Sequence, residues 1–508
     1  MKIRLIAVFF LLLNTVLAFA QDERPNIIFI LSDDLGYGDV SSINENSKIL
    51  TPNIDRLAQS GITFTDAHTS SSVCTPSRYG ILTGRYNWRS ILKKGVLGFY
   101  GKSIIESERT TMASMLKDKG YATACIGKWH LGFEWATTDG QTPQDKADRN
   151  NLDYSAKLKG GPTDLGFDYY FGVDAPNYPP YAYIHNDKIV GKPNEYFTFE
   201  KELDSRPGTG VKGWKQVDVM PTLQKKTIDY IAKAARKRKP FFMYLPLTGP
   251  HTPVVPTEEF LGQSGLNIYA DFVMQVDAYV GNILDALEQN GLAENTLVVF
   301  TSDNGCSPHA DFEELARLGH DPSYIFRGTK ADIYEGGHRV ACFLRWPEKI
   351  KQPQIIDEPI SMVDFMATFA SIVQYTFKDD EAEDSFDLSG LLFKQPKPSP
   401  KRESLVMHSI NGSFSIRKGH WKLEMCPGSG GWSFPRPGKQ TEDLARIQLY
   451  DLREDIAETQ NVASVHPEVV EALRSELKKI VGNGRSTPGK AQENDGTFIA
   501  ERMQWMAP

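Results

Sequence analysis

The sequence has few cysteines and no closely spaced pair of them. Five occur in 508 residues, and none stands in a C-x-x-C arrangement. This argues against a zinc ribbon or a thioredoxin-type redox site, which use such pairs. Cys74 is considered below. The other four, Cys125, Cys306, Cys342 and Cys426, could form two disulfides or remain buried thiols, and the sequence leaves both possible.

An excess of positive charge is also missing. Lys and Arg number 57 against 64 Asp and Glu, which gives a net charge of −7. A general polyanion-binding surface needs the opposite balance, so we expect no nucleic acid partner, and any anion must bind in a local basic pocket. The length and the hydrophobic content of 40% are those of a soluble protein with a large core and more than one domain.

Long apolar runs are confined to the N-terminus. Residues 1–20 are typical of a signal peptide, with Lys2 and Arg4 before the apolar residues 5–17 and a small-x-small cleavage site at 18–20. The run is short for a membrane anchor, and the absence of a cysteine at the cleavage point argues against a lipid anchor. We therefore expect an exported protein, periplasmic or secreted, with no membrane span and a mature chain that begins near Gln21.

Four apolar runs are each followed by a cluster of polar residues. Residues 26–31, 121–126, 241–245 and 296–300 are continuous apolar stretches, as expected of strands buried on both faces. Helical patterns cover residues 53–60, 111–119, 222–236 and 267–289. This alternation predicts an α/β fold with a large, mostly parallel sheet sandwiched by helices.

The pattern changes near residue 400. Residues 379–384 are acidic and 394–402 are rich in proline and lysine, which predicts a surface connection. Beyond it, short strands at 413–416, 421–425 and 447–451 and an amphipathic helix at 467–481 predict a smaller antiparallel sheet with a packed helix. We therefore expect a catalytic domain over 21–400 and a C-terminal α+β subdomain over 401–508.

The polar clusters lie where the predicted strands end. Ligands of parallel α/β sheets bind beyond the carboxyl ends of the strands, so we expect the clusters to share one site. In chain order they are Asp33 and Asp34, then Lys128 and His130, then His251, and finally Asp303 and Asn304.

The two acidic clusters offer only oxygen ligands. Hard cations such as Ca²⁺ and Mg²⁺ prefer oxygen, whereas zinc and copper prefer nitrogen and sulfur. The residues alone do not separate Ca²⁺ from Mg²⁺. Asp and Asn also form turns after strands, which is the alternative for either cluster taken singly.

The segment Cys74-Thr75-Pro76-Ser77-Arg78 is typical of a loop that enters a helix. Pro76 suits the first helical turn, and the helix dipole acts on a cysteine placed there. Arg78 lies one turn later, where it could complete an anion cradle with the helix amides, although a lone arginine more often pairs with a surface carboxylate.

Together these segments resemble the type I, formylglycine-dependent sulfatases of the alkaline phosphatase superfamily. The resemblance rests on C-T-P-S-R at 74–78, G-K-W-H-L-G at 127–132, His251 in G-P-H-T-P, and Lys330 before E-G-G-H-R at 335–339. It covers most of residues 25–345 and extends to bacterial carbohydrate sulfatases and arylsulfatase-like enzymes. It implies a sulfuric ester hydrolase whose Cys74 is oxidised to formylglycine (3-oxoalanine) by a maturation enzyme.

The resemblance also implies a role for each matching residue. Arg78 and Lys128 would steady the hydrated aldehyde, His251 and Lys330 would bind the sulfate and protonate the leaving oxygen, and His130 would take a proton from the second hydroxyl. Calcium, favoured over magnesium, would be held by five residues: Asp33, Asp34, the modified Cys74, Asp303 and Asn304.

Substrate contacts are expected from an aromatic segment. Residues 167–183 are rich in rings that could stack on sugars, and a packed aromatic loop is the alternative. We expect Asp174, Tyr178, His185 and Arg339 to contact a sulfated saccharide of glycosaminoglycan or mucin type, with galactose or N-acetylgalactosamine 6-sulfate as first choice. Two other functions stay open: a phosphoester or phosphonate hydrolase of the same superfamily, and a sugar-binding pseudoenzyme with unconverted Cys74.

Overall fold

The computed structural model describes residues 24–237, 239–393 and 401–506. The predicted signal peptide and residues 394–400 of the predicted connection lie outside these ranges. No helix in the described part of the chain has both the length and the apolarity needed to cross a bilayer. All five cysteines are buried free thiols, so the structure contains none of the disulfides that the sequence left open.

A ten-stranded sheet forms the centre of the molecule, in the order β15-β2-β14-β13-β1-β12-β4-β7-β8-β9. Its five middle strands, β13, β1, β12, β4 and β7, are all parallel, while antiparallel pairs occur toward both margins. The bounds are β1 (Asn26–Asp33), β2 (Ile62–Phe64), β4 (Ala122–Lys128), β7 (Tyr169–Val173), β8 (Ile184–His185), β9 (Lys188–Ile189), β12 (Phe241–Pro250), β13 (Thr296–Ser302), β14 (Cys342–Arg345) and β15 (Gln354–Ile356). The prediction of a large, mostly parallel sheet is confirmed.

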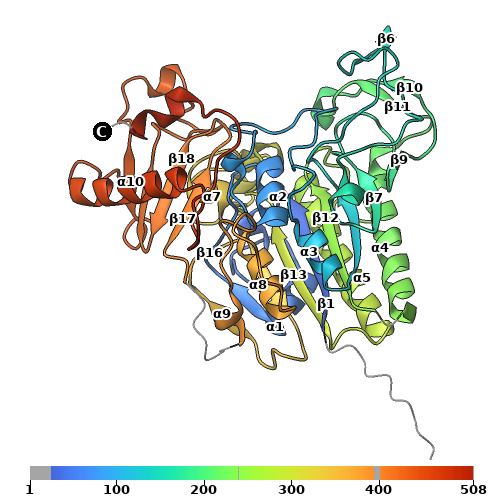
Figure 1. Cartoon of the computed structure of the whole chain (residues 1–508), viewed down its shortest axis with the longest axis horizontal. Helices are drawn as coiled ribbons and strands as arrows, with labels where there is room; N and C mark the ends of the chain where they lie inside the picture. Colours follow the sequence, from blue (N-terminus) through green and yellow to red (C-terminus); the bar gives the residue numbers. More distant parts are fainter. Residues whose placement is uncertain (1–23, 238, 394–400, 507–508) are drawn as a thin grey trace, which may run out of the picture.

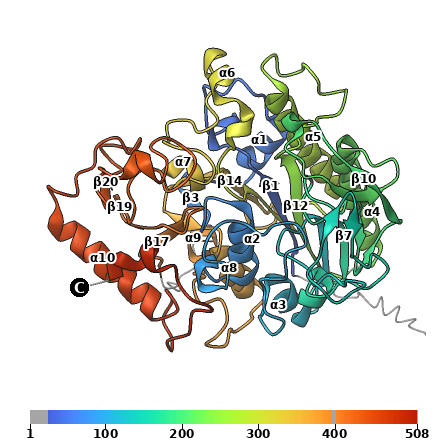
Figure 2. The ribbon, with the colours of Figure 1, turned by 90° about the horizontal axis from the view of Figure 1, so that it is seen from above.

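Helices cover both faces of this sheet. Strand β1 shows why, because Ile28 and Ile30 point into one core and Ile27, Phe29 and Leu31 into the other. The first core is closed by α1 (Pro52–Gln59), α4 (Val219–Lys237) and α5 (Ile268–Gln289). The second is closed by α2 (Cys74–Thr83), α3 (Met112–Asp118) and α8 (Asp364–Ile372), as Figure 2 shows from above.

The predicted strands are correct but stop short of the real ones. β1 continues to Asp33, β4 to Lys128 and β12 to Pro250. The reason is that backbone pairing in a parallel sheet does not depend on an apolar side chain: Asp33 pairs with Pro250, and Lys128 with Val173. Asp33 and Lys128 are therefore held by the sheet itself rather than by loops.

A second, smaller sheet lies beside the first (Figure 1). It is an antiparallel meander of β17 (Ser404–His408), β18 (Phe414–Lys418), β19 (Trp421–Glu424) and β20 (Gln448–Asp451), covered by α10 (Pro467–Gly482). Leu473 and Leu477 of α10 share a core with Ile416 and Leu423 of the sheet. The predicted antiparallel sheet with a packed helix is confirmed, and β17 is an additional strand.

The remaining elements are short. They are β3 (Ala67–His68), β5 (Asp145–Lys146), β6 (Arg149–Asn150), β10 (Pro193–Phe197), β11 (Gly208–Val211), β16 (Ile360–Ser361), α6 (Phe312–Arg317), α7 (Glu335–His338) and α9 (Ser389–Phe393).

The acidic segment at 379–384 is not the surface connection predicted from its charge. Glu383 and Asp384 are buried. The Asp384 carboxylate accepts hydrogen bonds from Arg89 Nε at 2.7 Å and from the backbone N–H groups of Tyr86 and Ser486 at 2.8 and 3.0 Å. A buried arginine needs such a partner, so this part of the acidic run is structural.

Candidate active site

The polar clusters predicted at strand ends do meet at one edge of the central sheet. Asp33 ends β1 and Lys128 ends β4, while His251 follows β12 and Asp303 follows β13. Because the strand order is β13-β1-β12-β4, these four ends are neighbours in space. The parallel sheet thus brings together residues that are up to 270 positions apart, as the Asn304–Asp34 contact illustrates.

Three carboxylates in this cluster are balanced by three basic side chains. Lys128 Nζ lies 2.8 Å from Asp33 Oδ2, and Lys330 Nζ lies 2.7 Å from Asp34 Oδ2. Arg78 donates to Asp303 Oδ2 from both Nε and Nη2, at 2.9 and 2.7 Å. All six residues are buried. Charges removed from water in this way require close partners, and here each has one.

Burial and neighbouring charge shift the pKa values in opposite ways. Burial alone would raise the pKa of Asp33, but the positive charges of Lys128, His251 and Arg78 outweigh it and hold that pKa well below its usual range. Burial raises the pKa of Asp303 well above its ordinary value, with the charge of Asp33 acting in the same direction and Arg78 against it. Asp303 therefore sits where further positive charge would be favourable.

Two oxygen atoms of the cluster lack a hydrogen-bond donor. Among the described residues, Asp33 Oδ1 and Asn304 Oδ1 are both buried and accept no hydrogen bond, although Arg78 Nη2 lies 3.2 Å from Asp33 Oδ1 and Asn304 Nδ2 donates to Asp34 Oδ1 at 2.7 Å. Buried acceptors without partners are rare and call for an explanation. A hard cation with oxygen ligands would supply one, so the donor set fits a cation of this kind. Ligand atoms of Asp33, Asp34 and His251 also lie within 4.8 Å of one another.

Cys74 is the first residue of α2 and faces a histidine. Its Sγ lies 3.3 Å from His130 Nδ1, and His130 Nε2 lies 3.0 Å from the carbonyl oxygen of Leu97. A carbonyl can only accept, so Nε2 carries the proton and Nδ1 presents its lone pair to residue 74. Burial, together with the charge of Lys128, lowers the pKa of His130 to about 3. The ring is therefore neutral at physiological pH.

The start of α2 is held rigidly. Ser77 Oγ lies 2.7 Å from the carbonyl of Ser71 and 3.0 Å from that of Val73, which fixes the turn that carries Cys74. Gly80 lets α2 pack closely on its neighbours, since a Cβ there would come within 2.7 Å of Ser70 Oγ and 3.0 Å of Val363 Cγ1. The sequence pattern of this helix thus orients residue 74 toward the site.

His251 is held in a similar way on the other side. Its Nδ1–H donates to the carbonyl of Thr252 at 2.6 Å, which leaves Nε2 facing Asp34 Oδ2 at 3.8 Å. Burial and the nearby charge of Lys330 lower the pKa of His251 to about 4. Burial alone would lower the pKa of Lys330. The negative charges of Asp34 and the neighbouring acidic groups outweigh burial and raise the pKa of this lysine above its ordinary value.

These groups open into a small pocket of about 140 Å³. Five residues predicted from the sequence line it: Cys74, His130, Tyr178, His251 and Lys330. Tyr178 packs edge-on against the His130 ring, with 5.6 Å between the ring centroids. The volume is below the roughly 300–1,000 Å³ of sites for drug-sized ligands, so the pocket suits one small ring or group.

Comparison with known proteins identifies the type of site. The family model described as Sulfatase matches residues 25–375. The chain belongs to the sulfatase family. It is 33% identical to an N-acetylgalactosamine-6-O-sulfatase of Bacteroides thetaiotaomicron, over 91% of this chain and 94% of the relative. It is 30% identical to human arylsulfatase A, over 91% of this chain and 89% of that protein.

A solved structure supports the same assignment. It is a 6S-sulfatase of Bacteroides thetaiotaomicron described in connection with the metabolism of multiple glycosaminoglycans. The TM-score is 0.78 at 32% identity, covering 90% of this chain and 99% of that one. The protein is thus a sulfuric ester hydrolase, and sulfatases are in general metal-dependent.

Three of the predicted substrate contacts do not line the pocket of this sulfatase. Asp174 lies behind His130 and accepts a hydrogen bond from its backbone N–H at 3.2 Å. His185 stands on the short strand β8, between β7 and β9, where its ring packs against Tyr169. Arg339 is engaged elsewhere, with Glu335 at 3.1 Å and the carbonyl of Thr65 at 2.8 Å. Tertiary packing, not chain proximity to an aromatic segment, decides which side chains reach the pocket.

The pocket also contains residues that the sequence did not reveal. They are Asn177, Asp204, Arg206, Ser307, His309, Ile410 and Trp432, among others. Most stand in loops without a motif. The glycine-rich run at 428–431 could have indicated a loop before Trp432, and loops often carry binding residues. Ile410 and Trp432 come from the C-terminal part of the chain, so both parts build the pocket.

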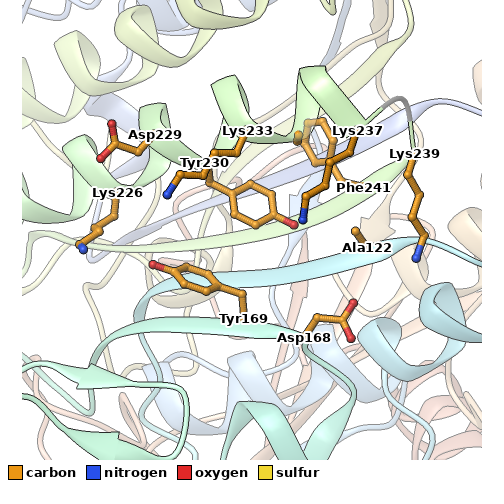
Figure 3. Close-up of a pocket in the computed structure, with 11 residues that line it drawn as sticks. Ala122, Asp168, Tyr169, Lys226, Asp229, Tyr230, Lys233, Lys237, Lys239 and Phe241 are labelled. Atoms are coloured by element: carbon orange, nitrogen blue, oxygen red, sulfur yellow. The ribbon is translucent and has the colours of Figure 1, made fainter.

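A larger groove of about 520 Å³ lies at the opposite end of the sheet (Figure 3). It is lined by Ala122 and Phe241, the first residues of β4 and β12, and by lysines of α4. Tyr169 and Tyr230 face each other there, with 5.8 Å between ring centroids. None of the predicted metal or catalytic residues lines it, so size alone does not mark the site of sulfate hydrolysis.

Proposed function

We propose that this sulfatase removes sulfate from sulfated carbohydrates of glycosaminoglycan or mucin type, with N-acetylgalactosamine or galactose 6-sulfate as its first substrate. The nucleophile is a hydrated formylglycine made from Cys74, and the metal is Ca²⁺. The observation that carries this proposal is the position of Cys74 at the start of α2, 3.3 Å from His130 Nδ1. The similarity to an N-acetylgalactosamine-6-O-sulfatase of Bacteroides thetaiotaomicron supports the choice of sugar.

The cation would be held by Asp33, Asp34, residue 74, Asp303 and Asn304. The Oδ1 atoms of Asp33 and Asn304, which are buried and accept no hydrogen bond, support this ligand set, and oxygen ligands favour Ca²⁺ over softer metals. When bound, it supplies Lewis-acid stabilisation of negative charge. Within this cluster, three carboxylates balance the charge of three basic side chains. A bound divalent cation would therefore give the cluster a net positive charge, which favours binding of an anionic ester.

The residues of the chain then carry out two stages. In the first, one hydroxyl of the hydrated aldehyde gives its proton to the Asp303 carboxylate, whose pKa is raised by burial, and attacks sulfur while Arg78 and Lys128 steady the diol. The bond between sulfur and the ester oxygen breaks, and the alcohol leaves with a proton from His251 while Lys330 binds the sulfate. His251 is neutral in the free protein, but an anionic ester beside it favours its protonated form.

In the second stage His130 acts as a base. Its Nδ1 removes the proton of the remaining hydroxyl, the carbonyl re-forms, and sulfate departs with the electrons of the C–O bond. Water then hydrates the aldehyde for the next turnover. A serine or an unmodified cysteine has no second hydroxyl and could not release sulfate in this way.

The setting of the enzyme is also part of the proposal. The sequence of residues 1–20 supports an exported, periplasmic or secreted protein, with residues 21–400 as the catalytic domain and 401–508 as a C-terminal subdomain. A maturation enzyme would convert Cys74. The small pocket favours removal of sulfate from a terminal sugar rather than from within a chain.

A saccharide panel tests the proposal. Protein produced with a formylglycine-generating enzyme would be offered sugars sulfated at defined positions, and released sulfate would be measured, with Cys74→Ala as control. We expect release from N-acetylgalactosamine or galactose 6-sulfate and none by the variant. Release from other positions only would refute the choice of sugar.

Two further measurements separate the remaining alternatives. Turnover of an aryl sulfate well above that of the matching aryl phosphate is expected of a sulfatase, whereas the reverse ratio indicates a phosphoester hydrolase. Mass spectrometry of the peptide that contains residue 74, isolated from the native host, should show formylglycine. An unmodified thiol there would indicate a binding protein instead.

A further inference from the structure

A second polar group stands on the wall of the catalytic pocket, apart from the cation cluster. Asp204 and Arg206 lie in the connection between β10 and β11, and His309 follows β13. In Figure 1 the β10–β11 hairpin lies above β7, toward the edge where the catalytic strands end. None of these three residues belongs to the motifs that identify the family.

Asp204 is held firmly although it stands in a loop. Arg206 Nη1 donates to its Oδ1 at 2.7 Å, and Thr252 Oγ1 donates to its Oδ2 at 3.3 Å. The backbone is fixed as well, since Asn177 Nδ2 donates to the Asp204 carbonyl at 3.1 Å and φ is 47°. The carboxylate is thus positioned before any ligand arrives, as specific recognition requires.

The carboxylate is charged and has room for more partners. Burial opposes its ionisation, but the hydrogen bond and charge of Arg206 lower the pKa of Asp204 below its ordinary value. Its side chain is 26% exposed, and it faces the pocket that also contains Cys74. Each carboxylate oxygen receives one hydrogen bond, and His309 Nε2 lies 3.8 Å from Oδ2, beyond hydrogen-bond distance, so each oxygen can accept a further donor.

The surroundings of Asp204 fit a sugar better than a second anion. Trp432, which is 37% exposed, offers an aromatic face on the pocket wall, and its backbone N–H is anchored to Asp332 Oδ1 at 2.7 Å. Sugar hydroxyls donate hydrogen bonds, which a carboxylate accepts strongly. A carboxylate on the ligand would instead be repelled by Asp204.

We infer that Asp204, positioned by Arg206, selects the sugar by accepting hydrogen bonds from hydroxyls of the ring that carries the sulfate. The site therefore admits neutral hexoses and hexosamines and rejects uronic acids. This inference rests on the proposed function. Because a hydrogen bond to a charged group contributes about a 10- to 100-fold change in equilibrium, its loss should be measured on that scale.

Substitution of Asp204 tests this with two substrates. Asp204→Asn and Asp204→Ala would be assayed on the sugar 6-sulfate and on 4-nitrophenyl sulfate, which has no ring hydroxyls. We expect kcat/KM to fall about 10- to 100-fold more for the sugar than for the aryl sulfate. Asp187→Asn is the matched control, since Asp187 is 27% exposed and pairs with Lys157 at 2.8 Å away from the pocket.

Deoxy sugars make the test independent of folding. In the wild type, removing the hydroxyl that Asp204 binds should reduce kcat/KM, while in Asp204→Ala the same removal should have no effect. Sulfated uronic acids should become better substrates of Asp204→Asn than of the wild type. Unchanged sugar turnover in the variants, or an equal loss on both substrates, would overturn the inference. Failure of the wild type on every sulfate ester would instead count against the proposed function.

Discussion

Replacing His130 by alanine should stop the sulfatase after its first turnover. In the proposed mechanism its Nδ1, 3.3 Å from Cys74 Sγ, acts only after the alcohol has left, when loss of a proton expels sulfate. The contact between Nε2 and the Leu97 carbonyl fixes the ring in the tautomer that can do this. The variant should therefore cleave one ester per active site and then retain sulfate on residue 74.

The size of the effect follows from the role. A positioned general base contributes about 10²–10⁴ in rate, which corresponds to about 3–5 kcal/mol of activation free energy. Burial and Lys128 lower the pKa of His130 to about 3, so the base form is fully present at neutral pH. Sulfate release by the wild type should accordingly lose this base only as the pH falls toward 3, and not near the usual pKa of about 6.5.

Stopped-flow measurements with 4-nitrophenyl sulfate would detect the trapped state. The His130→Ala variant should give a burst equal to the concentration of active sites, and the quenched peptide should carry one added SO₃ group. His185→Ala is the control, because His185 lies on the short strand β8 outside the pocket and should behave like the wild type. A slow steady rate without a burst would refute the assignment of His130 to the release stage.

Three further outcomes are expected. Asp384→Asn leaves the buried Arg89 without its counter-charge and should destabilise the protein by about 3–5 kcal/mol, seen by calorimetry; an unchanged melting temperature would contradict this. Burial lowers the pKa of His408 to about 3, so its contribution to stability is present above pH 6.5 and is lost as the pH falls toward 3. Between pH 7 and 5 the free energy of unfolding of the wild type should therefore fall by about 2 kcal/mol from this group. The fall should be smaller in His408→Asn, and denaturant titration of both proteins at the two pH values would measure it. Chelation of the metal should abolish activity and lower the melting temperature, and added Ca²⁺ should restore both. At a Ca²⁺ concentration of 100 times Kd, binding should add about 2.7 kcal/mol to the free energy of unfolding. The melting temperature of Asp303→Asn should not change when Ca²⁺ is added.

Much of the fold could be predicted because the pattern of apolar residues was unambiguous. The runs at 26–31, 241–245 and 296–300 are apolar on both faces, which only a sheet covered by helices on both sides accommodates. The pattern of apolar residues did not predict the full length of the strands, nor the strands near the margins of the sheet. β2 and β15 have three residues each, too few for a period to be recognised.

Charge was a poor guide to exposure in the C-terminal half. The acidic run at 379–384 indicated solvent, yet Asp384 is buried because Arg89, nearly 300 residues earlier, contacts it. A pairing over that distance leaves no trace in the local sequence. Buried ion pairs of this kind can be found only when both partners are seen in the same structure.

The residues of the site also fall into two groups, those that the sequence could place and those that it could not. Asp33 and Lys128 belong to strands, so their positions follow from the strand order, and a sequence that reveals the strands also reveals where these side chains meet. Asp204 and Trp432 stand in loops whose places depend on tertiary contacts, which include those with Asn177 and Asp332 respectively. The proposed chemistry of sulfate cleavage therefore depends largely on residues at the ends of the strands, whereas the proposed choice of sugar depends on loops that can change without disturbing the sheet. Relatives that share the strand-end residues but differ at position 204 should accordingly retain aryl sulfate hydrolysis while accepting different sugars.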